Sequence, residues 1–288
     1  MKRIFALICI LIITFSCSGC FKKDDLEGAT INTTVYPITY IANTLYGDSS
    51  NINSIYPNEA DVKNYKLTQK QIDEYSKSDI FIYNGLSNEK QIAKNFLNKN
   101  KKLKIIDVAY GLKYNYGVEE LWLSPSNFLM LASTVRTNLT DFIDNKYLVE
   151  EINKNYNTLE EEISIMDAEL RTIATSKNNP TIVVSSNLFK FLTNYGFNVI
   201  SLEDEENLTQ NNLTNIKSNF KNKKYTTIFM KDTDERNELI DTLVNSYDAK
   251  VITVNTMNTL SEENVKNNDT YISIMNEFLE NIRNVTLG

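Results

Sequence analysis

The 288-residue chain contains no histidine, which limits the chemistry open to its side chains. Without imidazole, a Ser-His-Asp triad and a Cys-His pair are excluded, and the commonest nitrogen ligand of metals is absent. Carboxylates are abundant, because 37 Asp and Glu residues oppose 30 Lys and Arg residues. Four acids stand together at residues 203–206 and could trap a cation, although such a run is more typical of a solvated loop.

Motifs of common enzyme classes are missing from the sequence. With only 8 glycines, the chain has no Gly-rich phosphate loop and no Gly-x-Ser-x-Gly elbow. The inventory of carboxylates leaves a glycosidase possible, but no pattern places two carboxylates in one cleft. A net charge of −7 without long basic runs argues against a nucleic-acid partner. We therefore expect neither an enzyme nor a nucleic-acid-binding protein, and a secreted hydrolase is the weakest of the alternatives.

The first twenty residues have the pattern of a secretory signal. Basic residues 2–3 precede an apolar run at residues 4–15, which is too short to span a bilayer. The small pair Ser18-Gly19 directly before Cys20 resembles a bacterial lipoprotein box, in which the cysteine becomes the first mature residue and carries the lipid. Cys17 stands where Leu is usual in that box. An ordinary cleaved signal is the alternative interpretation.

The cysteine count agrees with a lipid anchor. The chain has three cysteines, and Cys9 and Cys17 would leave with the signal, so no intramolecular disulfide can form in the mature chain. Loss of Lys2 and Arg3 leaves 28 positive and 37 negative charges, and such an acidic body would not dock on an anionic membrane by itself. We expect more than one acyl chain, such as palmitate, on Cys20, because one chain binds only weakly. The predicted location is the outer face of a bacterial cell membrane, and the predicted state is a monomer.

The rest of the sequence alternates short strand signals with helix signals. Such alternation predicts an α/β fold with two lobes, each a mainly parallel sheet flanked by helices. The expected strands are residues 31–36, 52–56, 79–83 and 103–108, and then 181–185, 198–202, 226–230 and 250–254. The expected helices are residues 38–45, 68–77 and 89–98, and then 188–195, 211–220, 235–247 and 270–285.

A long amphipathic helix is predicted between the two halves. Apolar residues recur every seven positions from Ile152 to Ile173, and a second set follows them by four. A helix over residues 148–173 would be about 39 Å long. A coiled coil is one interpretation, but the flanking α/β signals favour a strut that joins two lobes. The expected organisation is a signal peptide (1–19), an anchor linker (20–28), an N-terminal lobe (29–144), the connecting helix (145–178) and a C-terminal lobe (179–288).

Several strings follow one another in order along the mature chain, at residues 60–65 with 68–70, 78–85, 121–127, 183–189 closing at 195–197, and 269–276. Together they resemble the substrate-binding lipoproteins of bacterial zinc and manganese ABC importers. This group, cluster A-I, also includes adhesion lipoproteins. The resemblance implies the two-lobed fold, a cargo site in the cleft between the lobes, and a membrane permease as partner.

The resemblance also implies four metal ligands, and the sequence departs from the family at each position. Lys63 and Glu120 stand where the family has its first two histidines. Ser186 stands where the family has a histidine or glutamate. The fourth position falls in the loop at residues 254–259, where Asn255, Asn258 or Thr259 occupies the place of an acidic residue.

These substitutions predict a lost or altered transition-metal site. An ammonium group has donors only, so Lys63 would repel a divalent ion, and Glu120 is the only credible ligand left. One hypothesis is that the Lys63 ammonium replaces the metal and pairs with Glu120. The alternative is that Lys63 extends into solvent and Glu120 is merely exposed. We expect no cofactor, whereas the family implies zinc or manganese as cargo.

A third interpretation is a changed cargo. The polar set at the four positions carries both charges and would suit a hard cation or a small polar organic solute. Aromatic residues Tyr36, Tyr65, Tyr83 and Trp122 are candidates for the cleft wall, although aromatics usually belong to the core. The favoured function is a solute-binding lipoprotein that captures cargo between two lobes for a permease. The alternative is a surface adhesion or interaction lipoprotein without cargo.

Overall fold

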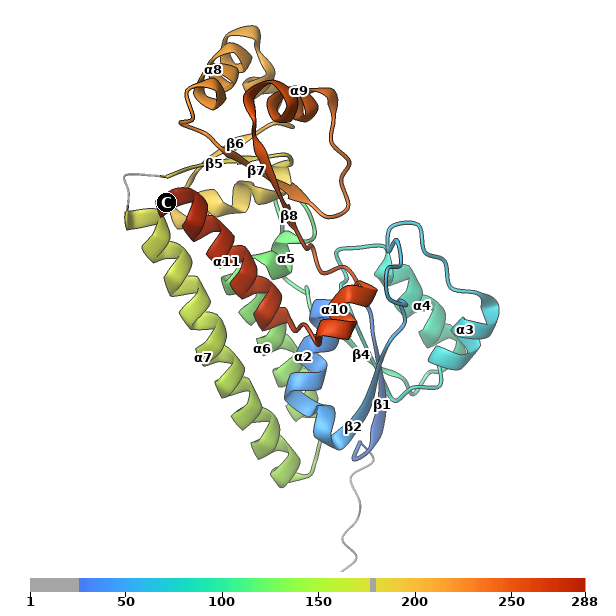
Figure 1. Ribbon diagram of the computed structural model, residues 1–288. Coiled ribbons are helices and arrows are strands. Elements are labelled where there is room, and N and C mark those ends of the chain that lie inside the picture. Colours follow the sequence, from blue (N-terminus) through green and yellow to red (C-terminus); the bar gives the residue numbers. More distant parts are fainter. Residues whose placement is uncertain (1–25, 177–179, 288) are drawn as a thin grey trace, which may run out of the picture.

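The computed structural model describes residues 26–176 and 180–287, which form two lobes joined by a bundle of helices (Figure 1). The signal sequence and Cys20, the expected site of lipid attachment, lie outside the described residues. Within the described residues, no helix is both long and apolar enough to cross a membrane.

The N-terminal lobe is built on a parallel four-stranded sheet with the order β2-β1-β3-β4. Its central strand β3 is buried at every position, as expected for a parallel sheet that is covered on both faces. Helix α3 begins with a capping box in which Thr68 and Gln71 bond each other's backbone, and Pro37 lies in the first turn of α2. The elements are β1 (Ala29–Thr33), α2 (Tyr36–Tyr46), η1 (Gly47–Ser49), β2 (Ser50–Ser54), α3 (Gln69–Tyr75), β3 (Ile80–Tyr83), α4 (Glu89–Lys99) and β4 (Lys104–Asp107).

The C-terminal lobe repeats this arrangement with a parallel sheet in the order β6-β5-β7-β8. The segment after β5 is a 3-10 helix, η2, rather than an α-helix, and it ends at Gly196 in the left-handed conformation. The elements are β5 (Thr181–Val184), η2 (Asn187–Tyr195), β6 (Asn198–Ser201), η3 (Glu205–Leu208), α8 (Gln210–Lys221), β7 (Thr227–Lys231), α9 (Glu238–Tyr247) and β8 (Lys250–Val254).

The helical bundle consists of α5 (Glu120–Leu123), α6 (Pro125–Phe142), α7 (Lys146–Ser176) and α11 (Tyr271–Leu287), with short α10 (Glu262–Asn267) leading into it. Helix α7 has 31 residues and runs along one side of the molecule from the N-terminal lobe to the C-terminal lobe (Figure 1). It packs against α2, α6 and α11. Its heptad residues are all buried, so the repeat in the sequence marks the face that contacts the bundle.

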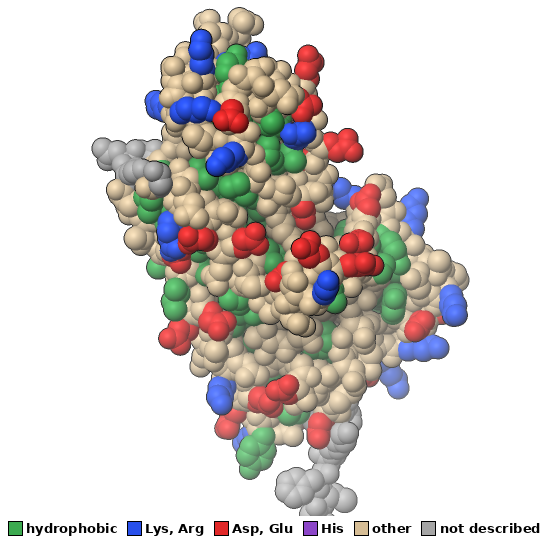
Figure 2. Space-filling model, viewed as in Figure 1, with side chains coloured by type: hydrophobic (Ala, Val, Ile, Leu, Met, Phe, Trp, Pro, Cys, Tyr) green, Lys and Arg blue, Asp and Glu red, His purple; other side chains and the backbone are tan. Residues whose placement is uncertain are grey.

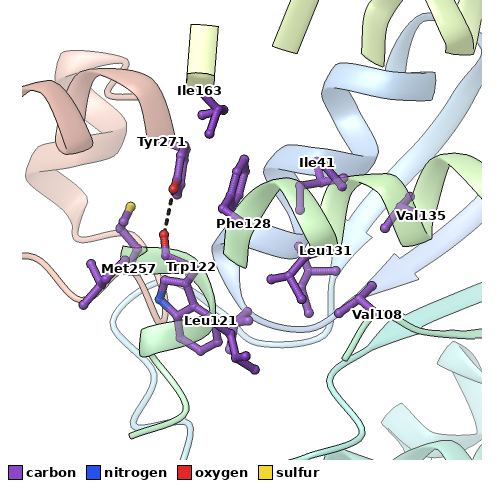
Figure 3. Close-up of a cluster of buried hydrophobic side chains, with 14 of the residues drawn as sticks. Ile41, Val108, Leu121, Trp122, Phe128, Leu131, Val135, Ile163, Met257 and Tyr271 are labelled. Atoms are coloured by element: carbon purple, nitrogen blue, oxygen red, sulfur yellow. Dashed lines mark hydrogen bonds between the residues drawn. The ribbon is translucent and has the colours of Figure 1, made fainter. Parts of the chain in front are cut away.

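A buried aromatic cluster ties α5, α6 and α11 together (Figure 3). The Tyr271 ring stacks on Phe128 with ring centroids 3.8 Å apart, and its hydroxyl donates to the carbonyl of Trp122 at 2.7 Å. The Trp122 indole donates to the carbonyl of Thr256 at 2.8 Å. These bonds connect the bundle to the loop that follows β8, so the end of the C-terminal sheet is held against the bundle.

The hydrophobic core is continuous from the N-terminal lobe through the bundle to one face of the C-terminal sheet. A second, smaller core lies on the other face of that sheet, under α8 and α9. Strand β5 shows the division directly, because Ile182 and Val184 belong to the large core and Val183 to the small one.

The structure confirms the expected fold class of two parallel α/β sheets joined by a long helix. Each expected strand is present within two residues of its predicted start. Helix α6 was not anticipated, although Pro125 and the apolar residues after it form a regular 18-residue helix. Tyr36 was expected to end a strand, but it is the first residue of α2.

Candidate functional site

A cavity of about 1160 Å³ lies between the two lobes. Parallel sheets usually bind ligands outside the carboxyl ends of their strands, and the cavity follows that rule in both sheets. Val35 follows β1, Asn84 follows β3, Asp232 follows β7 and Asn255 follows β8, and all four line the cavity. The remaining wall comes from the loop at residues 59–64 and from the bundle.

The cavity is strongly acidic. Lys63 is the one basic residue among those that line it, so the charges there favour a cation. Figure 2 shows Asp and Glu side chains gathered around the notch between the lobes on this face. The nine acidic residues of the lining are Glu59, Asp61, Glu89, Glu119, Asp232, Asp234, Glu263, Asp269 and Glu277.

Lys63 lies in an exposed turn at the edge of the cavity. Its backbone N–H donates to Asp61 Oδ1 at 3.1 Å, and the Asn64 amide donates to the other oxygen of Asp61 at 2.6 Å. The Asn64 hydrogen bond, with the Lys63 charge as a smaller contribution, lowers the pKa of Asp61. Lys63 forms no ion pair with the other described residues.

Glu120 does not reach the cavity, so the Lys63–Glu120 pair hypothesised from the sequence is absent. The Glu120 side chain is 4% exposed, and its Oε2 accepts the backbone N–H groups of Asn115 at 3.0 Å and Tyr116 at 3.3 Å. Backbone donors therefore satisfy this carboxylate in place of an ammonium group. The hypothesis was wrong because Glu120 holds its own preceding loop, while Lys63 remains in solvent.

Ser186 also lies away from the cavity lining. It is the N-cap of η2, where its Oγ accepts the N–H of Leu188 at 3.3 Å. Its hydroxyl donates to Glu203 Oε2 at 2.8 Å, and the same oxygen accepts the N–H of Asn187 at 2.7 Å. Burial alone would raise the pKa of Glu203, but these two hydrogen bonds lower it overall. Glu203, the first acid of the run at residues 203–206, therefore bonds the start of η2 and does not line the cavity.

Both asparagine candidates line the cavity, and both side chains are engaged. Asn255 Oδ1 accepts the N–H of Met257 at 2.8 Å, and its amide donates to Asn264 at 3.0 Å. The Asn258 amide donates to Glu119 Oε1 at 3.4 Å and to Thr256 Oγ1 at 3.2 Å. Asn258 thus connects a carboxylate of the bundle side with the loop after β8.

Glu119 and Asp232 are cavity carboxylates that the sequence did not single out. Glu119 is 8% exposed and stands on the N-terminal side of α5. Asp232 Oδ1 accepts the Thr256 hydroxyl at 2.6 Å, and partial burial raises the pKa of its carboxyl despite that bond. Through Asn258 and Thr256, a hydrogen-bonded chain joins the two carboxylates across the inner end of the cavity.

Glu89 is the most deeply buried acid of the cavity. It is 1% exposed, and its Oε2 accepts the N–H of Asn84 at 2.7 Å. Burial raises its pKa to about 7, and the bond from Asn84 opposes the shift. Gly85 makes this geometry possible, because any Cβ there would lie 1.9 Å from Asp107 Oδ2. The chain can therefore turn sharply between β3 and α4 and direct Glu89 inward.

Of the four aromatic candidates for the cleft wall, Trp122 lines the cavity, whereas Tyr36, Tyr65 and Tyr83 do not. Tyr36 donates instead to the carbonyl of Asp269 at 3.4 Å. Tyr65 packs edge-on against a neighbouring tyrosine ring.

No group of three or more His, Cys, Asp and Glu side chains within residues 26–176 and 180–287 is close enough to hold a metal ion together. The carboxylates of the cavity are instead spread over walls from both lobes. Carboxylate, hydroxyl and amide oxygens suit hard divalent cations, and carboxylates also bind zinc. The arrangement can attract a cation and offer it oxygen atoms.

One rule would have identified two of the three cavity acids that sequence reasoning missed. Glu89 and Asp232 both follow the carboxyl end of a parallel strand, where ligands of such sheets bind. Glu119 and Glu120 are neighbours, and the motif points to Glu120, whereas the backbone direction at the start of α5 turns Glu119 to the cavity. That choice between adjacent acids depends on local geometry that the motif does not contain.

Comparison with known proteins finds relatives that are similar over nearly the whole of this chain. The chain is 23% identical over 313 residues to the zinc-binding lipoprotein AdcA of Streptococcus pneumoniae, covering 99% of this chain and 61% of AdcA. It is 22% identical to the high-affinity zinc uptake system protein ZnuA of Bacillus subtilis, covering 99% of this chain and 97% of that protein. The chain therefore spans about three fifths of AdcA and nearly all of ZnuA.

Solved structures show the same fold. The Zn(II)-bound ZnuA-like domain of Streptococcus pneumoniae AdcA has a TM-score of 0.72 at 21% identity, covering 90% of this chain and 98% of that domain. The metal-dependent lipoprotein YcdH of Bacillus subtilis has a TM-score of 0.75 at 19% identity, covering 90% of this chain and 100% of that one. The profile of the family described as zinc-uptake complex component A, periplasmic, matches residues 31–285. That family consists of metal-binding receptors rather than enzymes, and this chain belongs to it.

Proposed function

We propose that this chain is an extracytoplasmic solute-binding lipoprotein that captures a divalent metal cation between its lobes and delivers it to an ABC permease. The observation that supports this most is the cavity, with nine acidic residues and one lysine in its lining. A cavity of this charge concentrates cations and repels anionic solutes. The names of its relatives, a zinc-binding lipoprotein and a zinc uptake protein, agree with a metal cargo.

The proposed ligands are oxygen atoms, with Glu119 and Asp232 as the principal ones. Thr256 and Asn258 lie between them. The Thr256 hydroxyl offers an oxygen atom, and the Asn258 amide donates to Glu119 and to Thr256. Such a site is altered from the family pattern, because its ligands are not those at positions 63, 120 and 186. Oxygen ligands hold zinc less selectively than imidazole, so manganese and other harder cations compete better here.

Capture needs only a small movement of the lobes. The core runs without a break from the N-terminal lobe into the C-terminal sheet, and α7 and α11 brace both. A cation then gains affinity from contacts that both walls make only when they are drawn together. Lys63, exposed at the edge of the cavity, is not a ligand in this account.

The proposal includes a lipid anchor at Cys20, which follows small residues Ser18 and Gly19. Cys20→Ser would prevent acylation and release the protein from the membrane fraction. Cell fractionation with an antibody to the protein tests this, with Cys9→Ser, in the apolar run outside the lipoprotein box, as the matched control that stays on the membrane. Equal retention of both variants would contradict the anchor.

The test of the cargo is calorimetric titration of the metal-stripped mature protein with Zn²⁺ and Mn²⁺. We expect one ion per chain, and a loss of affinity of at least about tenfold in Glu119→Gln, because one charged ligand contact is worth ~1.5–3 kcal/mol. Glu120→Gln is the matched control, because the carboxylate of Glu120 accepts backbone N–H groups and does not line the cavity. Failure of the wild-type protein to bind either ion would favour a surface role without metal cargo.

A further inference from the structure

Glu89 has no ionic partner, although it lines an open cavity and is almost completely buried. No Lys or Arg side chain of the described residues forms an ion pair with it. A buried carboxylate without a cation is costly in its ionised form, so such a group either takes up a proton or awaits a positive charge.

Two buried hydroxyls lie near Glu89, those of Thr34 and Tyr56, whose side chains are 0% and 4% exposed. The Thr34 hydroxyl interacts with the Glu89 carboxylate and lowers its pKa. The Tyr56 hydroxyl interacts with Glu89 electrostatically and has no hydrogen-bond partner among the described residues. Buried hydroxyls are normally satisfied, so an unsatisfied one near a carboxyl group calls for an explanation.

A carboxyl group that changes its protonation state would explain such a hydroxyl. When Glu89 carries a proton, its O–H can donate to a hydroxyl oxygen, and when it is ionised the hydroxyls can rotate and donate to it. The surroundings of Glu89 therefore accommodate both protonation states of its carboxyl group without moving a heavy atom. A permanent charge or a permanent neutral group would need only one of these arrangements.

The remaining groups around Glu89 are anionic or neutral. Asp107, at the end of β4, raises the pKa of Glu89 by its charge, while the Asn84 N–H and the hydroxyls of Thr34 and Ser87 oppose the shift. Tyr83 of β3 also interacts with Glu89, and burial raises the pKa of that phenol. With burial as the largest cause, the pKa of Glu89 is about 7, so this carboxyl is about half protonated at neutral pH.

We propose that Glu89 couples cargo to protons, so that a divalent cation entering the acidic cavity expels the proton from the Glu89 carboxyl. This rests on the proposed function, because it requires a cationic cargo in the cavity. The ion itself sits at Glu119 and Asp232, and Glu89 acts through space, where low dielectric makes a double charge effective. Proton uptake in turn weakens cation binding, because the coupling is reciprocal.

The test is titration calorimetry of the metal-stripped mature protein with Zn²⁺ in two buffers of different ionisation enthalpy at each pH. The difference between buffers gives the protons released per ion. At pH 7 we expect the wild-type protein to release about half a proton more per bound ion than Glu89→Gln does. At pH 8.5 we expect the two proteins to release the same number of protons. The affinity of the wild type, relative to this variant, rises by about tenfold from pH 6 to pH 8.

Two further variants make the outcome specific. Glu263→Gln removes a charge from an exposed position of the same cavity, so it keeps the proton release and lowers affinity at every pH alike. Tyr56→Phe removes one potential donor to the ionised carboxylate, so it moves the pH midpoint of release upward. It also serves as the second variant should Glu89→Gln fold poorly.

The outcomes separate this inference from the proposed function. Zn²⁺ binding with equal proton release by wild type and Glu89→Gln would overturn the coupling and leave the cargo proposal intact. Absence of Zn²⁺ binding by the wild type at every pH would overturn both. An unchanged midpoint in Tyr56→Phe would count against the coupling, because Glu89 would have lost a potential donor without any change in the titration that it is proposed to cause.

Discussion

The two lobes have the same strand order, but their sheets are packed differently. In the N-terminal lobe, both faces of the sheet belong to the large core that continues into the bundle. In the C-terminal lobe, one face joins that core and the other covers a separate small one beneath α8 and α9. The N-terminal lobe, the bundle and the inner half of the C-terminal lobe therefore form one packed body, to which an outer layer is attached.

The two walls of the cavity also differ in how deeply their carboxylates are buried. On the N-terminal side, Glu89 and Glu119 are both more than nine-tenths buried. On the C-terminal side, Asp232 and Asp234 are at least partly exposed and follow the end of β7. One wall thus holds its charges in fixed, dehydrated positions, while the other presents charges that water still reaches. A cation would meet a preorganised wall and be closed in by an adaptable one.

Large-to-small substitution in each core tests this comparison most severely. Phe128→Ala in the large core and Phe220→Ala in the small one should each lower the free energy of unfolding by about 3–5 kcal/mol, because both rings are fully buried. Hydrogen exchange should separate them. Phe128→Ala should speed exchange in both lobes, and Phe220→Ala mainly in α8 and α9. Identical exchange patterns would contradict the division into two cores.

The buried carboxylate predicts a pH-dependent stability difference. The pKa of Glu89 is about 7 in the folded protein and about 4.3 in an unfolded chain, so the folded state binds the proton more tightly. Its contribution is therefore fully favourable below about pH 4.3 and is lost as pH rises from there through about 7, at a cost of roughly 4 kcal/mol. Glu89→Gln should raise the melting temperature more at pH 8 than at pH 5. An equal shift at both pH values would show that Glu89 is not buried as described.

The turn that directs Glu89 inward should be sensitive to one added methyl group. In Gly85→Ala the new Cβ would meet the Asp107 carboxylate, so we expect a loss of about 1–3 kcal/mol in the free energy of unfolding. Denaturant unfolding of Gly85→Ala, and of Gly85→Ala combined with Asp107→Ala, measures it. The second substitution should recover part of the loss, and equal stability of the two variants would locate the strain elsewhere.

The smallest effect is expected at Lys63. Because Lys63 is exposed and unpaired within the described residues, Lys63→Met should change the free energy of unfolding by less than about 0.5 kcal/mol. Thermal unfolding measures this directly. A clear loss of stability would restore the hypothesis of a buried pair with Glu120.

Most of the fold could be predicted from the sequence because its signals are local. The seven-residue repeat from Ile152 to Ile173 marks the buried face of α7, and the β-branched run of β5 marks a strand covered on both faces. Helix α6 was missed because the string before it was interpreted as a motif. The proline that opens the helix is nonetheless an ordinary start signal.

The site could be predicted less well because it depends on side-chain direction. Of the six residues named by resemblance, Lys63, Asn255, Asn258 and Thr259 line the cavity, and Glu120 and Ser186 bond neighbouring backbone instead. A motif fixes positions along the chain but not which of two adjacent acids faces inward. The unpaired state of Glu89 is a property of everything packed around it, and no local pattern records it.

The most direct test of the proposed cation site is a crystal structure of the mature protein grown with Zn²⁺, with diffraction measured on both sides of the zinc absorption edge. We predict a single anomalous peak between the lobes, about 2.0–2.2 Å from oxygen atoms of Glu119 and Asp232. A peak coordinated by Glu120, or no peak in the cavity at saturating zinc, would contradict the account.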